Sequence, residues 1–488
     1  MAVAGARRSY QATYAVLTVG VVGYALLQSL VIPVLATIQA GLHTSQNTVT
    51  WVLTAYLLSA SIFTPIMGRL GDMFGKERFL VLALIALALG SLMAALADSV
   101  TVMIVARVIQ GIGGGVLPLA FGLIRDEFPK EKVTSAIGTI AALAAAGAGL
   151  GIVLAGPIVK ALDYHWLFWI PMVVLAGAAL AAHLIIPESE VRQPGRISWA
   201  GVFLLSGWLT ALILAISEAP TWGWGSSKVI ALLLAAVVLG VVWVIVESSS
   251  SHPLIDMQMM RMPTVWTTNL VALLLGVGQY AVFAFLPEFM QTPSSAGYGF
   301  GLSVTRSGLL LLPLSVVMFA FGMVSGRLSK RYGAKFVMAA GLVMSIPTFI
   351  LLTVANTSQW EIIIAMVIQG AGFGLAYTSM SALVVEAVPA SQTGVASGMN
   401  ANIRTIGGAI GAAVMSSIVT SGVRAGHLPP KSGYTHGFAL LIVVAVAAAV
   451  AGILGPKTRP ATHGTREEML HAELALVPGG TLAGDGEE

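Results

Sequence analysis

The feature that most constrains this chain is a succession of apolar runs of about 20 residues, which follow one another from residue 13 to residue 455. A helix of that length crosses the hydrocarbon core of a bilayer, where the backbone must satisfy its hydrogen bonds internally. Charged residues make up only 9% of the 488 residues, and hydrophobic residues make up 57%. Because so few charges cannot cover a soluble fold, the sequence predicts an all-α, multi-pass membrane protein.

Glycine, proline and clusters of charge divide the apolar runs into fourteen predicted transmembrane helices. An even number places both chain ends on one side of the membrane. Residues 1–12 are expected to be a cytoplasmic N-terminus without a signal peptide, and residues 457–488 a disordered cytoplasmic tail. The predicted helices cover residues 13–35, 50–71, 78–97, 100–123, 133–159, 165–187, 196–217, 227–246, 264–290, 305–327, 334–354, 360–385, 393–421 and 435–455.

The basic residues indicate the orientation of these helices. Most of the 25 lysines and arginines fall in loops on the side of the chain ends. Short loops rich in lysine and arginine stay cytoplasmic, so that side is predicted to be cytoplasmic. Orientation also explains the net charge of +4 better than a nucleic-acid partner does, and the absence of cysteine excludes disulfides and thiolate metal sites. The basic residues on the opposite side are Lys160, Lys228, Arg306, Arg424 and Lys431.

The chain repeats itself at a nearly constant offset. Gly68–Lys76 reappears as Gly326–Ala334, and Val108–Gly111 reappears as Val367–Gly370. Two such matches in the same order predict two parallel six-helix bundles with two inserted helices between them. The expected divisions are residues 13–190 for the first bundle, 191–262 for the insert and linker, and 263–456 for the second bundle.

The loop after the second helix is a candidate gate. Asp72 lies among the basic residues Arg69, Lys76 and Arg78, and Gly68 and Gly75 mark a sharp turn or a close approach of two backbones. We interpret this loop as a latch that holds the two halves together, and the alternative is a tight turn that carries topology charge.

Arg107 lies inside a predicted span, where a lipid-facing cation would cost about 2.5–3.5 kcal/mol, so it must face a cavity or a polar partner. Gln110 follows it by one turn. Glu288, directly after Pro287, is interpreted either as a proton-entry carboxyl or as a solvated helix end. The position of Arg107 inside the span favours a functional role over a cation that only reaches for the membrane surface.

Polar residues in the spans are candidates for a substrate cavity, because transporter sites form near the midplane at the interface of the repeats. Each of them could instead make a hydrogen bond between helices. The candidates are Gln28, Tyr56, Asn269, Gln279, Asn400 and Arg404.

Small residues three or four positions apart form seams at which helices cross closely and slide. We expect these positions to act as packing hinges. They are Gly147, Gly151, Gly156, Gly407 and Gly411.

Together these residues resemble the major facilitator superfamily, and the order of six, two and six helices resembles its 14-helix drug–proton antiporter branch. Gly68 to Arg78 is similar to the signature loop of that family, and Arg107 to Gly115 is similar to its helix-4 motif, which is linked with proton coupling. The resemblance implies that Arg107 and Gln110, together with Glu288, serve proton coupling. Trp51–Leu58 resembles the start of helix 2 in that branch. The resemblance implies a monomeric, multi-pass protein of the cell inner membrane with cytoplasmic termini and without a cofactor, a metal or catalytic residues.

Two departures from the branch bear on substrate and coupling. Its helix 1 usually carries an Asp, whereas Ala25–Ser29 here contains no carboxylate. In its helix-5 motif, Gly-Pro normally comes before a pair of glycines. Here the order differs, because Gly156-Pro157 comes after Gly151. Without the helix-1 acid, Arg107 and Arg404 favour anionic or neutral amphipathic substrates.

The sequence therefore predicts a secondary active transporter that exports hydrophobic or amphipathic small molecules, such as drugs and antibiotics, in exchange for protons. Its partners would be the substrate, protons and the lipid bilayer, with no nucleic acid. Uptake or uncoupled facilitation by the same fold, and a sensor without flux, stay open as alternatives. An enzyme is disfavoured because the chain has no metalloprotease, nucleophile-elbow or phosphate-binding motif.

Overall fold

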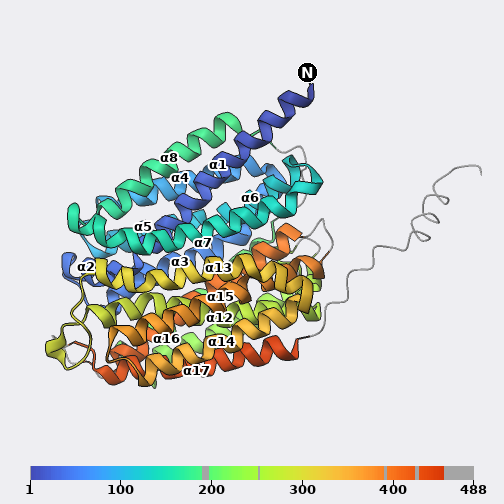
Figure 1. Cartoon of the computed structure of the whole chain (residues 1–488). Helices are drawn as coiled ribbons and strands as arrows, with labels where there is room; N and C mark the ends of the chain where they lie inside the picture. Colours follow the sequence, from blue (N-terminus) through green and yellow to red (C-terminus); the bar gives the residue numbers. More distant parts are fainter. Residues whose placement is uncertain are drawn as a thin grey trace, which may run out of the picture.

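The computed structural model describes residues 2–188, 197–250, 253–388, 393–421, 423 and 428–455, which form a bundle of long helices (Figure 1). The predicted tail, residues 457–488, lies outside the described residues. The first half contains α1 (Ala2–Leu30), η1 (Ile32–Val34), α2 (Leu35–Gly41), α3 (Gln46–Phe74), α4 (Lys76–Ala95), α5 (Val100–Gly111), η2 (Ile112–Gly115), α6 (Val116–Glu127), α7 (Lys130–Ala161) and α8 (Trp166–Ile185).

The insert and the second half follow the same pattern of long helices and short connections. They contain α9 (Trp199–Trp222), α10 (Ser227–Ser249), α11 (Met257–Met260), α12 (Pro263–Gln291), η3 (Ser294–Ala296), α13 (Val304–Tyr332), α14 (Ala334–Val354), α15 (Gln359–Ala387), α16 (Thr393–Thr420) and α17 (Lys431–Leu454).

Thirteen helical stretches in the described part of the chain are long and apolar enough to cross a membrane. Each corresponds to one of the fourteen predicted spans. The remaining predicted span coincides with α7, a helix of 32 residues in which Gly147–Ala161 counts as a shorter apolar stretch among the described residues. The prediction of an all-α membrane protein is therefore confirmed, and thirteen of its spans meet this criterion in the described residues.

Local signals at the helix ends explain where the observed boundaries differ from the predicted ones. α3 begins four residues before the predicted residue 50, because the Ser45 side chain accepts a hydrogen bond from the backbone N–H of Thr48. It ends at Phe74 because Gly75 adopts φ = 123°, which interrupts the helix. Gly333, the repeat equivalent of Gly75, separates α13 from α14 with φ = 88°. The same turn thus recurs in both halves.

The two halves lie side by side, with α1 to α8 in one layer and α12 to α17 in the other (Figure 1). They meet where α3 contacts α16 and where α7 contacts α13. The beginning of α1 and the end of α17 lie at the same end of the bundle, which we call the terminal face, and the other end is the opposite face. The halves touch at both faces. α6 contacts α16 near the terminal face, and Gln46 of α3 bonds to Glu288 of α12 near the opposite face.

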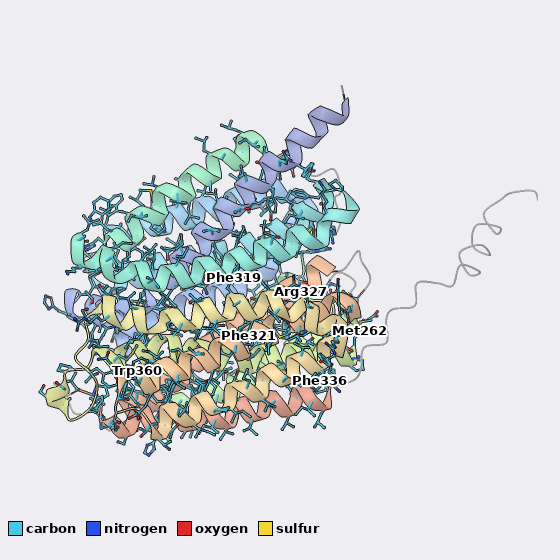
Figure 2. All side chains as sticks on the ribbon, in the orientation of Figure 1. Met262, Phe319, Phe321, Arg327, Phe336 and Trp360 are labelled. Carbon is cyan, nitrogen blue, oxygen red and sulfur yellow. The ribbon has the colours of Figure 1, made fainter. Side chains whose placement is uncertain are left out.

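The insert lies against the junction of the halves. α9 packs on both α3 and α16, whereas α10 packs mainly on α9. Near the opposite face Trp51 Nε1 of α3 donates a hydrogen bond to Glu218 Oε1 of α9, at 3.0 Å. Large apolar side chains such as Phe336 and Trp360 project outward from the bundle (Figure 2). Such an apolar exterior suits lipid rather than water.

Candidate functional site

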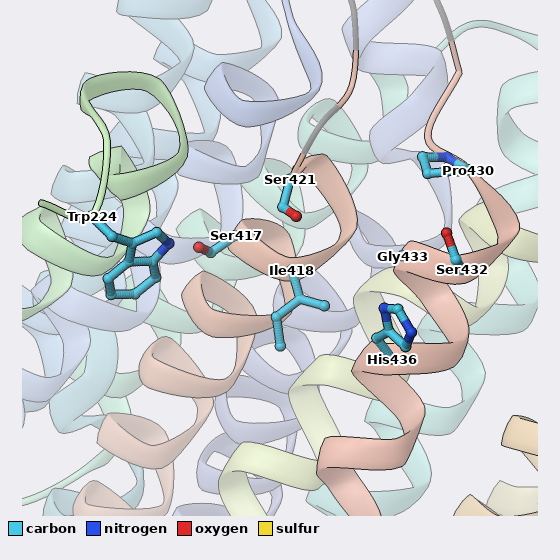
Figure 3. A pocket seen from close by; sticks show the side chains of 8 residues that line it. All are labelled: Trp224, Ser417, Ile418, Ser421, Pro430, Ser432, Gly433 and His436. Carbon is cyan, nitrogen blue, oxygen red and sulfur yellow. The ribbon is translucent and has the colours of Figure 1, made fainter.

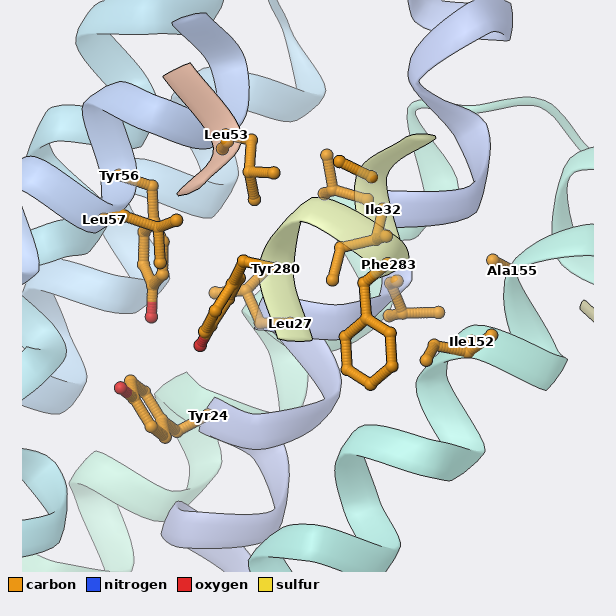
Figure 4. Packing of buried hydrophobic residues seen from close by; sticks show 14 of the residues in the cluster. Tyr24, Leu27, Ile32, Leu53, Tyr56, Leu57, Ile152, Ala155, Tyr280 and Phe283 are labelled. Carbon is orange, nitrogen blue, oxygen red and sulfur yellow. The ribbon is translucent and has the colours of Figure 1, made fainter. Parts of the chain in front are cut away.

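Three tyrosine hydroxyl groups from three helices meet inside the bundle. Tyr24 of α1, Tyr56 of α3 and Tyr280 of α12 are buried, and their hydroxyl groups point toward one another (Figure 4). We call these residues the tyrosine cluster. Gln28, one turn after Tyr24, donates a hydrogen bond from Nε2 to the Tyr280 hydroxyl. Because α12 belongs to the second half and the other helices to the first, the cluster joins the two halves.

Arg107 borders the tyrosine cluster as a fully buried cation. Its guanidinium lies over the Tyr56 ring, with Cζ 4.4 Å from the ring centre. Its Nε donates to the Val52 carbonyl oxygen at 2.8 Å, and its Nη1 donates to Gln110 Oε1 at 2.6 Å. Its Nη2 has no hydrogen-bond partner among the described residues. Dipoles and an aromatic face, rather than a carboxylate, therefore balance this charge.

Gln110 extends the Arg107 network to a third helix. Its Nε2 donates to the Ser91 hydroxyl of α4 at 3.0 Å. Both side chains are fully buried. The helix is interrupted directly after Gln110 and Gly111 by the η2 turn, at Ile112–Gly115. The sequence prediction of a polar partner for Arg107 thus corresponds to a chain of donors and acceptors across α3, α5 and α4.

Arg404 borders the cluster from the second half. Its guanidinium lies over the Tyr377 ring of α15, with Cζ 4.9 Å from the ring centre. The Tyr377 hydroxyl donates to Gln279 Oε1 at 2.5 Å. Arg404 is also within electrostatic range of Tyr24 and Tyr280. It is only half-buried and makes no ion pair in the part of the chain that the structure describes.

The predicted cavity residues therefore divide into two groups. Gln28, Tyr56, Gln279 and Arg404 lie at or beside the tyrosine cluster. Asn269 and Asn400 instead bond to each other, with Asn400 Nδ2 donating to Asn269 Oδ1 at 2.9 Å. Both are buried, and Asn400 also donates to the Thr268 carbonyl oxygen. Asn269 and Asn400 therefore link α12 to α16 by a hydrogen bond. The other four predicted residues are the candidate substrate contacts.

Glu288 closes the seam between the halves at the opposite face. Its Oε2 accepts a hydrogen bond from Gln46 Nε2 of α3 at 2.7 Å, and its Oε1 accepts one from the Tyr434 hydroxyl of α17 at 2.5 Å. Gln291, one turn further, donates to the Pro33 carbonyl oxygen at 2.8 Å. The Glu288 carboxyl group is thus a bonded element of a contact between the halves, rather than a solvated helix end.

A network of charges holds the signature loop inside the first half. Lys76 is buried, and its Nζ lies 2.7 Å from Asp126 Oδ2 and 3.4 Å from Asp72 Oδ1. Arg78 Nε lies 3.0 Å from Glu188 Oε2. Asp72, Lys76 and Asp126 belong to α3, α4 and α6, so the ion pairs tie together helices of one half.

The other predicted residues of this loop have different surroundings. Gly75 makes the turn, and a Cβ there would also collide with the Glu188 carboxylate. Gly68 lies within α3 and has open space where a Cβ would be. Arg69 is half-buried, with no described hydrogen-bond partner for its Nε. Of the two glycines, only Gly75 serves the turn predicted from the sequence.

The predicted hinge glycines lie at close helix contacts, most of them within one half. Gly147 and Gly151 of α7 face the backbone of α1, and Gly407 and Gly411 of α16 face the backbone of α12. These are equivalent helix pairs in the two repeats. Gly156 instead faces the backbone of Thr305 in α13, across the junction of the halves. Only this position lies where the halves would slide on each other.

We expect Gly407→Ala to destabilise the protein, because its Cβ would overlap the Leu273 carbonyl oxygen of α12. Overpacking of this kind costs about 1–3 kcal/mol, whereas alanine at an open helical position gains up to about 1 kcal/mol. Gly177→Ala is the matched control, because nothing lies within 4 Å of a Cβ at that position. Thermal unfolding of the purified protein in detergent should show a lower midpoint for the first variant only, and equal midpoints would contradict the observed packing.

A separate cavity of about 310 Å³ opens at the opposite face, between the α9–α10 connection, α16 and α17 (Figure 3). Trp224 lies on one side and His436 on the other, with Ser417 and Ser421 between them. None of the cavity residues predicted from the sequence lines this space. It is therefore distinct from the tyrosine cluster.

Several residues of the site are not evident from the sequence. Tyr24, Tyr280 and Tyr377 read as ordinary members of apolar runs, and Gln46 and Tyr434 read as interfacial residues. A tyrosine in the middle of a span is a usable signal, because its hydroxyl group needs a hydrogen-bond partner there.

Comparison with known proteins places these features in a wider group. The sequence profile of the Major Facilitator Superfamily matches residues 17–293 and 268–482. The tetracenomycin C resistance and export protein of Streptomyces glaucescens is 27% identical, over 96% of this chain and 89% of that protein. The multidrug transporter protein MdtP of Bacillus subtilis is 28% identical, over 78% of this chain and 69% of its own length. The multidrug resistance protein Stp of Mycobacterium tuberculosis is 28% identical, over 81% of this chain and 73% of that protein.

Solved structures of transporters share the arrangement of helices. A human organic anion transporter matches with a TM-score of 0.64 and 16% sequence identity, over 92% of this chain and 99% of that one. A nucleoside transporter matches with a TM-score of 0.62 and 16% sequence identity, over 91% of this chain and 99% of that one. At this identity the likeness concerns the fold alone.

Proposed function

Because the chain belongs to the major facilitator superfamily, we propose that it exports hydrophobic or amphipathic small molecules by alternating access, in exchange for protons. The observation that carries this proposal is the tyrosine cluster, a polar site enclosed between two repeated halves that contact each other at both faces. A site at the interface of two repeats can open to either side when the halves rock against each other.

The direction of transport is supported by the relatives. The proteins of Streptomyces glaucescens, Bacillus subtilis and Mycobacterium tuberculosis are named for export or for multidrug resistance. Each matches more than three quarters of this chain. Export of a drug or an antibiotic is therefore the activity that we assign to this chain.

The substrate is proposed to bind at the tyrosine cluster. Gln28, Gln279 and Tyr377 offer donors and acceptors there, and Arg404 offers a half-buried charge. Aromatic rings and a few polar groups are the lining that small-molecule sites usually have. Arg107 holds the Tyr56 ring and the backbone of α3 in place, and Gln110 accepts a hydrogen bond from Arg107.

The two faces are proposed to act as gates. At the opposite face, Gln46 bonds to Glu288 and Gln291 bonds to the Pro33 backbone, so opening requires these bonds between the halves to break. At the terminal face, Lys76 ties Asp72 to Asp126, so that α3, α4 and α6 move as one unit.

A proton carrier must be a group that can lose its proton. Arginine stays protonated in proteins, so Arg107 and Arg404 can influence a proton but cannot supply one. Glu288 is a carboxyl group that bonds across the seam of the halves. We assign proton binding to Glu288. Arg107 and Gln110 are assigned as residues that position Tyr56 at the substrate site.

The membrane is proposed to be the cell inner membrane, with the terminal face in the cytoplasm and the protein acting as a monomer. The lysines and arginines of the connections favour this orientation by the positive-inside rule. A monomer suffices because both halves of the site come from one chain.

The test is proton movement in inside-out vesicles that hold the protein and have an acidified lumen. Adding a transported compound from a panel of cationic, neutral and anionic amphiphiles should raise the lumenal pH, because protons leave as the compound enters. Vesicles without the protein are the control. No response to any compound, together with no compound accumulation, would rule out the exporter.

A second candidate is uncoupled facilitation, and one observation favours it: no carboxylate occupies the segment Ala25–Ser29 of α1. The same vesicles separate the two candidates. Substrate that equilibrates without a change in lumenal pH, and that never accumulates above its outside concentration, would indicate a facilitator.

A further inference from the structure

The charges inside the membrane-spanning helices have one sign. Each Asp or Glu in a described helix lies close to a helix end, as Asp72, Glu218 and Glu288 do. Arg107 and Arg404, in contrast, lie inside their spans. No carboxylate is paired with either arginine in the described part of the chain. The enclosed site therefore carries positive charge that no described carboxylate neutralises.

Both guanidinium groups have unused capacity to bind an acceptor. Arg107 is fully buried, yet its Nη2 lacks a hydrogen-bond partner among the described residues. Arg404 is half-buried, and its described contact is with the face of the Tyr377 ring rather than with an acceptor atom. A buried cation gains most from a partner of opposite charge, because charge-assisted hydrogen bonds are the strong ones.

Aromatic surface surrounds these charges. Tyr24, Tyr56, Tyr280 and Tyr377 are placed on four helices from both halves, and three of their hydroxyl groups converge (Figure 4). Aromatic rings recognise flat aromatic ligands by offset stacking or edge contact. The hydroxyl groups can donate to a phenolate, a carboxylate or a carbonyl oxygen.

We propose that the enclosed site selects planar aromatic anions, with Arg404 as the residue that binds the anionic group and the tyrosines as the surface that binds the rings. This substrate class rests on the proposed export function and narrows it. A permanently cationic amphiphile would meet two like charges with no carboxylate to offset them, so the site discriminates against it.

This selection has a consequence for the driving force. A monovalent anion that leaves in exchange for one entering proton moves the equivalent of two positive charges inward, whereas a monovalent cation exchanged for a proton moves none. Export of an anion should therefore accelerate when a potassium gradient with valinomycin makes the cytoplasmic side negative. Export of a monovalent cation should not respond to that potential.

The test uses the purified full chain in liposomes with two dyes that share a xanthene ring system, anionic fluorescein and cationic rhodamine 123. We expect transport of fluorescein in preference to rhodamine 123. Arg404→Gln should slow fluorescein transport at least about tenfold, equivalent to ~1.4 kcal/mol of lost binding. Arg404→Lys should retain more transport than Arg404→Gln, because it keeps the charge but loses the planar group. Lys330→Gln, an exposed position at the terminal face, is the charge-matched control and should transport normally.

The outcomes separate the substrate class from the function. Preference for rhodamine 123, or fluorescein transport that is unchanged in a folded Arg404→Gln, would overturn the anion class and leave the exporter standing. Transport of only neutral or cationic members of the amphiphile panel would do the same. Failure of both dyes and of every panel compound would overturn the exporter, and the substrate class with it.

Discussion

Arg107→Met is expected to fold as well as the parent chain and to lose at least about tenfold of its transport rate, equivalent to ~1.4 kcal/mol, because the Tyr56 ring is no longer held at the tyrosine cluster. Methionine is the right replacement, since the second half carries Met366 at the equivalent position and buries it completely. Replacing a buried, incompletely paired charge with an apolar side chain of similar size is often neutral or stabilising.

The transport loss follows from what Arg107 holds in place. Its guanidinium covers the Tyr56 ring and bonds to the Val52 carbonyl oxygen and to Gln110. Without it, Tyr56 loses the contact that fixes its ring at the tyrosine cluster. Thermal unfolding in detergent and dye transport in liposomes measure the two effects separately.

The matched control is Arg261→Met, an exposed arginine in the connection between α11 and α12. It removes the same chemical group from a position away from the cluster and should keep its transport. Normal transport by a folded Arg107→Met would show that Arg107 only fills space. A strong loss of stability in Arg107→Met would show that its hydrogen bonds outweigh the cost of its burial.

The fold could be predicted from the sequence because it depends on lengths and repeats. Runs long enough to cross a bilayer must be helical, and the recurrence of the turn at Gly75 and Gly333 reflects one architecture used twice. Helix ends were displaced by a few residues wherever a local cap decided them, as Ser45 does for α3.

The site could be predicted only in part, because the direction of a side chain around its helix is set by the neighbouring helices. Gln279 and Asn269 are both polar residues of α12, yet one meets Tyr377 near the cluster and the other pairs with Asn400. Helical periodicity does not separate these outcomes without knowledge of which helices pack on which side. The bond between Gln46 and Glu288 joins residues 242 positions apart, so no local pattern indicates it.

Glu288→Gln is expected to abolish substrate-driven proton movement while preserving exchange of labelled for unlabelled substrate. Glutamine has nearly the shape of glutamate, and its amide oxygen can still accept a hydrogen bond from Gln46 or from Tyr434. It cannot take up or release a proton in the cycle. The seam between the halves should therefore still close, but closing and opening should no longer carry a proton.

The assay compares lumenal pH in inside-out vesicles with counterflow in liposomes without a pH gradient. Substrate-driven proton release should fall to the level of vesicles without the protein, a loss of at least about tenfold. Glu218→Gln is the matched control. Glu218 is a half-buried carboxylate of α9 near the same face, and it accepts a hydrogen bond from Trp51 of α3. It should keep both activities. Proton release by Glu288→Gln at the parent rate would assign coupling to another group, whereas loss of counterflow as well would make Glu288 a gate residue without a proton role. The combination of lost proton release and preserved counterflow is the result that only a proton-carrying Glu288 explains.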